Sequence, residues 1–205
     1  MKAVIQRVAE ASVTVGGARI SSIGPGLCVL LGINVDDTEK ETEYMVRKIL
    51  NLRLFEDGSG SGRAWSCSVV DRDLEVLLVS QFTLQAVLKG NKPDFHQAMP
   101  AQRAEPFYNR VLEEMRSKYR PDRVKDGKFG AHMQLQIQND GPVTIELSSP
   151  AGPGDPRLQS KQEKQQQRKD KSRSKGPAES GDKGSRPDPG TSSGAEGQVS
   201  SEREA

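Results

Sequence analysis

Gln138-Asn139-Asp140-Gly141-Pro142-Val143-Thr144 lies between two stretches in which apolar and polar residues alternate, residues 133–138 and 143–147. Alternation with period two is typical of strands with one buried face, and an Asn-Asp-Gly-Pro cluster favours a reversal between them. We therefore predict two strands joined by a tight turn. Gly141 has unusual backbone freedom and Pro142 has no N–H, so the carbonyl groups of this pair are expected to point away from the ladder. A hairpin turn with no further role is the simpler interpretation.

Upstream, the N-terminal third of the chain predicts more strands. Residues 4–15 form one long or bulged strand, Gly16-Gly17 turns it, and residues 18–23 return beside it. Residues 27–33 are apolar throughout, which is typical of a strand covered on both faces.

Two helices separate the remaining strands. Thr38 and Glu41 have the spacing of a capping box, and the helix that they begin should end near Leu50. The second helix is expected to have Pro106 in its first turn and to end before Pro121. Its apolar stripe contains Phe107, Val111, Leu112, Met115 and Tyr119.

Shorter elements fill the middle of the chain. Residues 52–55 and 65–70 are predicted as short strands on either side of a Gly- and Ser-rich loop. Residues 74–79 form a buried strand that leads directly into Ser80-Gln81-Phe82-Thr83-Leu84-Gln85, and residues 89–93 form a basic loop. The prediction is an α+β domain with a largely antiparallel, barrel-like sheet and two main helices.

The composition changes near residue 150. From Gly152 to Ala205 there is no Phe, Tyr, Trp, Ile or Met, and Leu158 and Val199 are the only large aliphatic residues. Such a segment cannot bury enough apolar surface to offset the entropy of ordering. We predict a folded domain at 1–150 and a disordered, basic and Ser-rich tail at 151–205.

Few residues suggest familiar chemistry. The two histidines, His96 and His132, have no metal-ligand spacing, so the sequence leaves any metal site unknown. Ser80 and Thr83 are possible nucleophiles, but no neighbouring residue is an evident general base. No apolar run reaches membrane-spanning length, and residues 1–7 lack the apolar core of a signal peptide. We expect a cytoplasmic protein without a membrane partner.

Three separated motifs resemble the D-aminoacyl-tRNA deacylase family, also called D-tyrosyl-tRNA deacylase. They are residues 1–8 (MKAVIQRV), 80–85 (SQFTLQ) and 139–144 (NDGPVT). The resemblance covers residues 1 to about 150 in the family's order, and the tail is similar to that of the vertebrate members.

The resemblance implies a homodimer that hydrolyses the ester between a D-amino acid and the 3′-terminal adenosine of tRNA. Glycyl-tRNA is an expected second substrate, because glycine is achiral. Ser80, Gln81, Phe82 and Thr83 are expected to line the pocket. A cis Gly141-Pro142 bond is expected to reach the other subunit's pocket, where main-chain carbonyls hold the substrate amine and exclude an L side chain.

The expected chemistry needs neither a catalytic triad nor a cofactor. An aminoacyl ester is already activated, and the neighbouring ribose hydroxyl can assist its hydrolysis, so the protein must mainly position the ester and stabilise the oxyanion. The main-chain N–H groups of Phe82 and Thr83 are the candidate donors. Thr83 as a covalent nucleophile is the alternative.

The tail has a second candidate role. Its cations can contact RNA or DNA phosphates non-specifically or serve as a nuclear address, so a nuclear pool is possible. A solvated tail with no such role is the alternative, and serines beside acidic residues such as Ser200-Ser201-Glu202 could accept phosphate. The cations considered are Lys161, Lys164, Arg168, Lys169, Lys171, Arg173 and Lys175.

Overall fold

The computed structural model of the protein describes residues 1–58 and 63–150. The predictions made for the 151–205 tail lie outside the described residues. In chain order the elements, with η for short 3₁₀ helices, are β1 (Lys2–Val15), β2 (Ala18–Ile23), β3 (Gly26–Gly32), α1 (Glu39–Asn51), β4 (Glu75–Ser80), η1 (Phe82–Gln85), β5 (Val87–Lys89), β6 (Lys92–Asp94), α2 (Ala101–Lys118), η2 (Pro121–Arg123), β7 (Val124–Asp126) and β8 (Gln134–Ser148).

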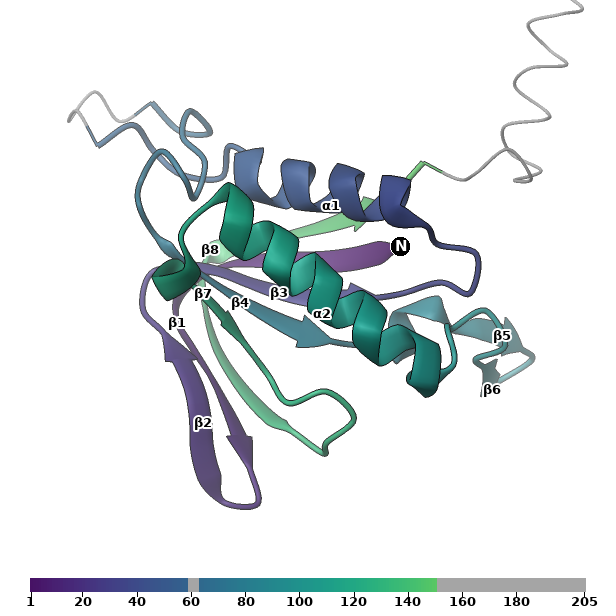
Figure 1. Ribbon diagram of the computed structural model, residues 1–205. Helices are drawn as coiled ribbons and strands as arrows, with labels where there is room; N and C mark the ends of the chain where they lie inside the picture. Colours follow the sequence, from purple (N-terminus) through teal and green to yellow (C-terminus); the bar gives the residue numbers. More distant parts are fainter. Residues whose placement is uncertain (59–62, 151–205) are drawn as a thin grey trace, which may run out of the picture. The chain divides into compact units, whose positions relative to one another are not determined.

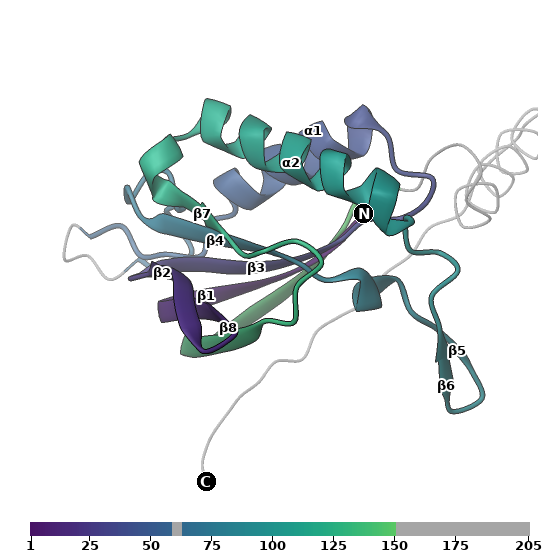
Figure 2. The same ribbon diagram turned by 60° about the horizontal axis from the view of Figure 1, so that its bottom comes forward.

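Strand β1 is the centre of the main sheet. One of its edges pairs with β8 over nearly the whole strand, and the other pairs first with β3 and then with β2, all antiparallel. Strands β3 and β4, and β4 and β7, are parallel. The resulting mixed sheet curls into a nearly closed barrel (Figures 1 and 2), which confirms the predicted α+β, barrel-like class.

Both faces of the inner strands are covered. Helices α1 and α2 lie side by side over one face of the sheet (Figure 1), while the other face encloses the barrel interior. Leu27, Val29 and Leu31 of β3 belong to the core that includes the helices, whereas Cys28 belongs to the barrel core. The prediction that residues 27–33 are covered on both faces is confirmed.

The capping box of α1 is confirmed. The Thr38 hydroxyl accepts a hydrogen bond from the Lys40 N–H, and the Glu41 carboxylate accepts one from the Thr38 N–H at 2.7 Å. These contacts supply partners for donors that a helix start leaves unpaired.

Helix α2 starts earlier than predicted. It begins at Ala101, where the Pro100 carbonyl accepts the first two helical hydrogen bonds, so Pro106 lies in the second turn and not the first. Because Pro106 has no N–H, the Gln102 carbonyl receives no hydrogen bond from it within the helix. Gln102 is exposed to water. Tyr108 replaces Phe107 as the fully buried aromatic of the stripe.

The predicted hairpin at 133–147 is wrong: β8 is one strand. On β1, Gln6 pairs with Thr144 and Val8 with Asn139, so the four residues 140–143 lie opposite Arg7 alone. The Asn139 side chain spans this bulge, since its amide oxygen accepts the Val143 N–H at 2.7 Å and its nitrogen donates to the Val143 carbonyl at 3.1 Å. The strand therefore continues past the Gly-Pro pair in the same direction.

Other short elements also differ. Residues 52–55 and 65–70 form no strands and share only the bridge between Phe55 and Cys67. Asp71 accepts hydrogen bonds from the Ser68 N–H and hydroxyl, which bends the chain away from a ladder. Of the basic loop predicted at 89–93, only Gly90 and Asn91 form a turn, because Lys89 ends β5 and Lys92 and Pro93 lie in β6.

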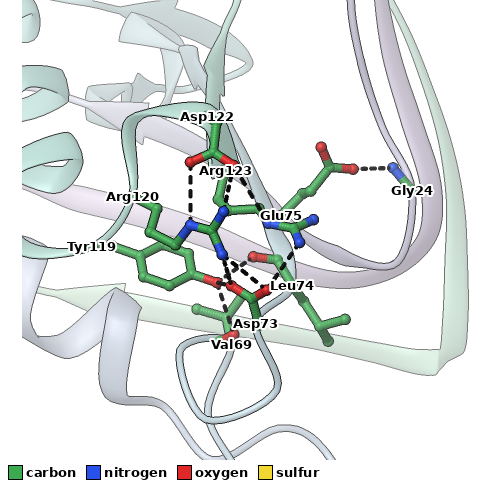
Figure 3. Close-up of polar contacts among 9 residues, drawn as sticks. All are labelled: Gly24, Val69, Asp73, Leu74, Glu75, Tyr119, Arg120, Asp122 and Arg123. Carbon is green, nitrogen blue, oxygen red and sulfur yellow. Dashed lines mark hydrogen bonds and ion pairs between the residues drawn. The ribbon is translucent and has the colours of Figure 1, made fainter.

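A polar cluster fixes the start of β4 (Figure 3). Arg120 and Arg123 both donate to the Asp73 carboxylate, and the Tyr119 hydroxyl donates to the Leu74 carbonyl at 2.8 Å. Burial, followed by the Asp73 charge, raises the pKa of Tyr119 to about 12, so this hydroxyl remains a donor at neutral pH. The end of α2 is thus tied to the strand whose other end is Ser80.

We expect only one of the two thiols to react in the native state. Cys28 is buried in the barrel core, and burial raises the pKa of its thiol to about 12, so the reactive thiolate is scarce. Cys67 is half-buried. Titration with a thiol reagent should count one group before unfolding and two after it. Two fast-reacting groups in the native protein would contradict this burial.

Candidate functional site

The polar residues after β4 stand where an inner strand ends. Ser80 pairs with Leu31, the Gln81 N–H donates to the Leu31 carbonyl at 2.7 Å, and the chain then turns into η1. Gln81 is half-buried, while Phe82 and Thr83 are exposed. Residues 80–83 therefore occupy a rigid position with their outer side open.

A buried amide holds η1 in place. The Gln85 side chain is 1% exposed; its nitrogen donates to the Gly32 carbonyl at 2.8 Å and its oxygen accepts from Asn34 at 3.2 Å. Gly32 is a point of close approach, because a Cβ there would lie 2.8 Å from Leu84 Cβ and 2.9 Å from the Gln81 carbonyl oxygen. Glycine is needed for η1 to approach β3 this closely.

Two main-chain donors remain free at this turn. The Leu84 N–H donates to the Gln81 carbonyl at 3.2 Å, but the N–H groups of Phe82 and Thr83 have no acceptor among residues 1–58 and 63–150. The Thr83 hydroxyl accepts from the Gln81 amide at 2.5 Å. Within that part of the chain no imidazole or carboxylate contacts the hydroxyl, so Thr83 has no visible base.

Gly141 and Pro142 occupy the bulge of β8. The peptide bond between them is cis, as predicted, and both residues are exposed. Arg7, opposite the bulge, donates through Nε to the Asp140 carbonyl at 3.1 Å and through Nη1 to the Leu54 carbonyl at 2.7 Å. Its guanidinium also lies 5.9 Å from the ring centroid of Trp65.

The two motifs do not meet within one protomer. Ser80 pairs with Leu31 of β3, Leu31 pairs with Ala3 of β1, and Ala3 pairs with Leu147 of β8. Leu147 lies six residues along β8 from Gly141. Ser80 and Gly141 are thus separated by three strand spacings across the sheet and by four residues along β1, which corresponds to a distance of roughly 15–20 Å. Within one chain, the two motifs therefore lie too far apart to line the same side of one small pocket.

The remaining candidates add no metal centre. Among the described residues, no group of three or more His, Cys, Asp and Glu side chains has metal-binding geometry. His96 is exposed beside Asp94, and His132 precedes β8 instead of lying within a strand. Nor does this part of the chain contain a helix long and apolar enough to cross a membrane.

Sequence reasoning missed Arg7, Asn34 and Gln85. Arg7 has a signal, because it is a cation inside an otherwise apolar and polar alternation. Gln85 lies within the motif at 80–85, but its contact with the backbone of Gly32 on another strand has no local signal.

The molecule is a barrel-like α+β domain with free main-chain donors at the end of an inner strand. The chain belongs to the D-Tyr-tRNA(Tyr) deacylase family, whose sequence model matches residues 4–148.

Relatives extend over the whole chain. D-aminoacyl-tRNA deacylase 1 of Danio rerio is 67% identical and that of Homo sapiens 66%, each covering 100% of both chains. The D-aminoacyl-tRNA deacylase of Chlorobaculum parvum is 49% identical and covers 73% of this chain and 99% of its own.

A solved structure, "c-Myc DNA Unwinding Element Binding Protein", is 70% identical with a TM-score of 0.71, and covers 74% of this chain and 100% of its own. A probable eukaryotic D-amino acid tRNA deacylase, 18% identical with a TM-score of 0.63, shares the fold; it covers 71% of this chain and 97% of its own.

Proposed function

We propose that the protein hydrolyses the ester bond of D-aminoacyl-tRNA and releases free tRNA and the D-amino acid. Family membership along nearly the whole described domain carries this proposal, together with the intact motifs at 80–83 and 141–142. Glycyl-tRNA is a second substrate, because glycine has no side chain that the site could reject.

The main chain provides the chemistry. The free N–H groups of Phe82 and Thr83 donate to the oxygen that becomes negatively charged as the ester is attacked. Ser80 and Gln81 line the same wall of the pocket. The neighbouring ribose hydroxyl assists the attack, so the protein requires no cofactor.

Selectivity comes from a second copy of the chain in a homodimer. Gly141 and Pro142 project from β8, which pairs on one edge only among the described strands, and they lie far from their own protomer's Ser80. In the dimer their carbonyls accept hydrogen bonds from the substrate amine, and the rigid backbone clashes with an L side chain. Sedimentation of an active monomer at working concentration would exclude this arrangement.

Matched D- and L-tyrosyl-tRNA substrates test the function. The purified chain should hydrolyse the D ester and glycyl-tRNA and leave the L ester intact. Equal hydrolysis of the D and L esters would contradict the proposed selectivity. If neither ester were hydrolysed, the proposed activity itself would be wrong.

Thr83→Ala should reduce kcat by about tenfold or less and not abolish it, because the main-chain N–H at that position survives. Thr83→Ser is the matched control that keeps a hydroxyl. Single-turnover kinetics measure both variants. A covalent acyl-Thr83 adduct, trapped on the wild-type protein and seen by mass spectrometry, would instead establish the nucleophile mechanism.

Gly141→Ala should lower activity more than stability. Gly141 has φ +129°, and a Cβ there would lie 2.8 Å from Val143 Cγ2 and 3.1 Å from an Arg7 guanidinium nitrogen. The backbone strain is worth about 1–3 kcal/mol, and it falls on the bulge that carries the selectivity pair. Melting temperature and D-tyrosyl-tRNA hydrolysis should be compared. A variant with wild-type kinetics and selectivity would contradict the role of this residue.

The second candidate function is nucleic-acid binding by the basic tail. Its seven cations from Lys161 to Lys175 favour phosphate contacts. Full-length and 1–150 chains should differ in the slope of log affinity against log salt. Equal slopes would show that the tail does not contribute to nucleic-acid binding. A cytoplasmic location with a nuclear pool remains a prediction.

A further inference from the structure

The β5–β6 hairpin stands apart from the main sheet. Its two strands pair only with each other within the described residues, and it projects beyond the sheet and both helices (Figures 1 and 2). An isolated two-stranded hairpin is marginally stable by itself, and no packing role for the domain core explains this one.

The hairpin is nevertheless held beside the candidate site. The Phe95 ring, directly after β6, makes an edge-to-face contact with Phe82 at a centroid distance of 5.1 Å. The next residues are fixed as well, since the Val35 N–H donates to the Gln97 carbonyl at 2.9 Å and Asn34 bridges to Ala98. At its other end β5 follows η1 after one residue. The hairpin is therefore positioned by the residues that position Phe82 and Thr83.

Its surface is cationic. Asp94 is the hairpin's one carboxylate; it pairs with Lys89 and contacts His96, and these contacts hold the pKa of its carboxyl well below the usual range. Lys92 is exposed and has no ion pair among the described residues. With Asp94 already neutralised, the Lys92 charge is available to a ligand.

We propose that the β5–β6 hairpin contacts the sugar–phosphate backbone of the tRNA acceptor stem, with Lys92 pairing with a phosphate. This inference rests on the proposed function, because an ester bound at Phe82 and Thr83 leaves the rest of the RNA outside the pocket. A lysine ammonium is a mobile point charge suited to a phosphate. Leu88, which is 71% exposed beside Lys89, covers too little apolar area for a stable protein interface.

Two substrates separate stem binding from chemistry: D-tyrosyl-tRNA, and D-tyrosyl-adenosine, which has no stem. Lys92→Glu should raise the KM for D-tyrosyl-tRNA about tenfold with kcat unchanged, and leave hydrolysis of D-tyrosyl-adenosine as in the wild type. Lys92→Ala should make the slope of log kcat/KM against log salt shallower by about one for the tRNA.

Lys118→Glu is the matched control. It makes the same charge change on an exposed lysine, here one that pairs with Glu114, at the far end of α2 (Figure 1), and should leave both substrates unaffected. Three results would overturn the proposal: equal effects of Lys92→Glu on both substrates, no effect of Lys92→Glu on either substrate, or an equal effect of Lys118→Glu. A wild-type chain that cleaves neither substrate would refute the proposed function instead.

Discussion

Gly32→Ala should reduce kcat for D-tyrosyl-tRNA about a hundredfold. The added Cβ would lie 2.8 Å from Leu84 Cβ and 2.9 Å from the Gln81 carbonyl oxygen, so the turn that carries Phe82 and Thr83 must move away from β3. A displacement of about 1 Å in a positioned catalytic group is enough for a loss of that size. The same overpacking should lower the free energy of unfolding by only about 1–3 kcal/mol.

Gly24→Ala is the control for this prediction. A Cβ there has ordinary contact with the Glu75 carboxylate at 3.6 Å, and its N–H bond to that carboxylate is retained. Rates and thermal melting should be measured on both variants. A folded Gly32→Ala protein with wild-type kcat would show that the position of η1 does not control the chemistry.

Asp37→Asn should lower the free energy of unfolding by about 3–5 kcal/mol, or the melting temperature by about 10 °C or more. The Met1 ammonium lies 2.5 Å from the Asp37 carboxylate, and both groups are largely buried: Met1 is 5% exposed and the Asp37 side chain 6%. Burial raises the pKa of Asp37, while the charge of the Met1 ammonium acts in the opposite direction. The amide that replaces the carboxylate keeps one acceptor oxygen but has no charge, so the Met1 ammonium loses its counter-ion and retains the Ser149 hydroxyl, at 2.7 Å, as its other acceptor.

Asp36→Asn removes the same charge from the neighbouring, exposed residue and should be nearly neutral. Both variants should begin at Met1, as mass spectrometry can verify. If thermal unfolding is unchanged in Asp37→Asn, the buried ammonium must have another route to water or to an acceptor.

Much of the fold could be predicted because local patterns and tertiary structure agree. The capping box at Thr38 and Glu41, the turn at Gly16-Gly17 and the doubly covered strand at 27–33 each have one favourable local conformation. The prediction of a hairpin at 138–144 was wrong for the opposite reason. Local sequence favours a reversal there. The strand nevertheless continues in one direction, because it pairs with the long β1 and because the Asn139 side chain forms hydrogen bonds across the bulge.

The site was predictable only as separate pieces. Residues 80–83 are visible as polar residues after an apolar strand, and the cis bond was expected from the family resemblance. The contacts that position these pieces join residues far apart in sequence, Gln85 with Gly32 and Arg7 with Asp140. No local pattern encodes such pairs.

The pairing of β1 with β8 also has a consequence for how the chain acquires its structure. Lys2 is opposite Ser148, so the strand that emerges first during synthesis has no partner on one edge until the last strand of the domain is available. Closing so long a loop adds little to the equilibrium cost, since each doubling of loop length costs only about 0.6 kcal/mol. It slows the search for native contacts far more. The nascent domain must therefore wait with its central strand half-paired until translation has passed β8.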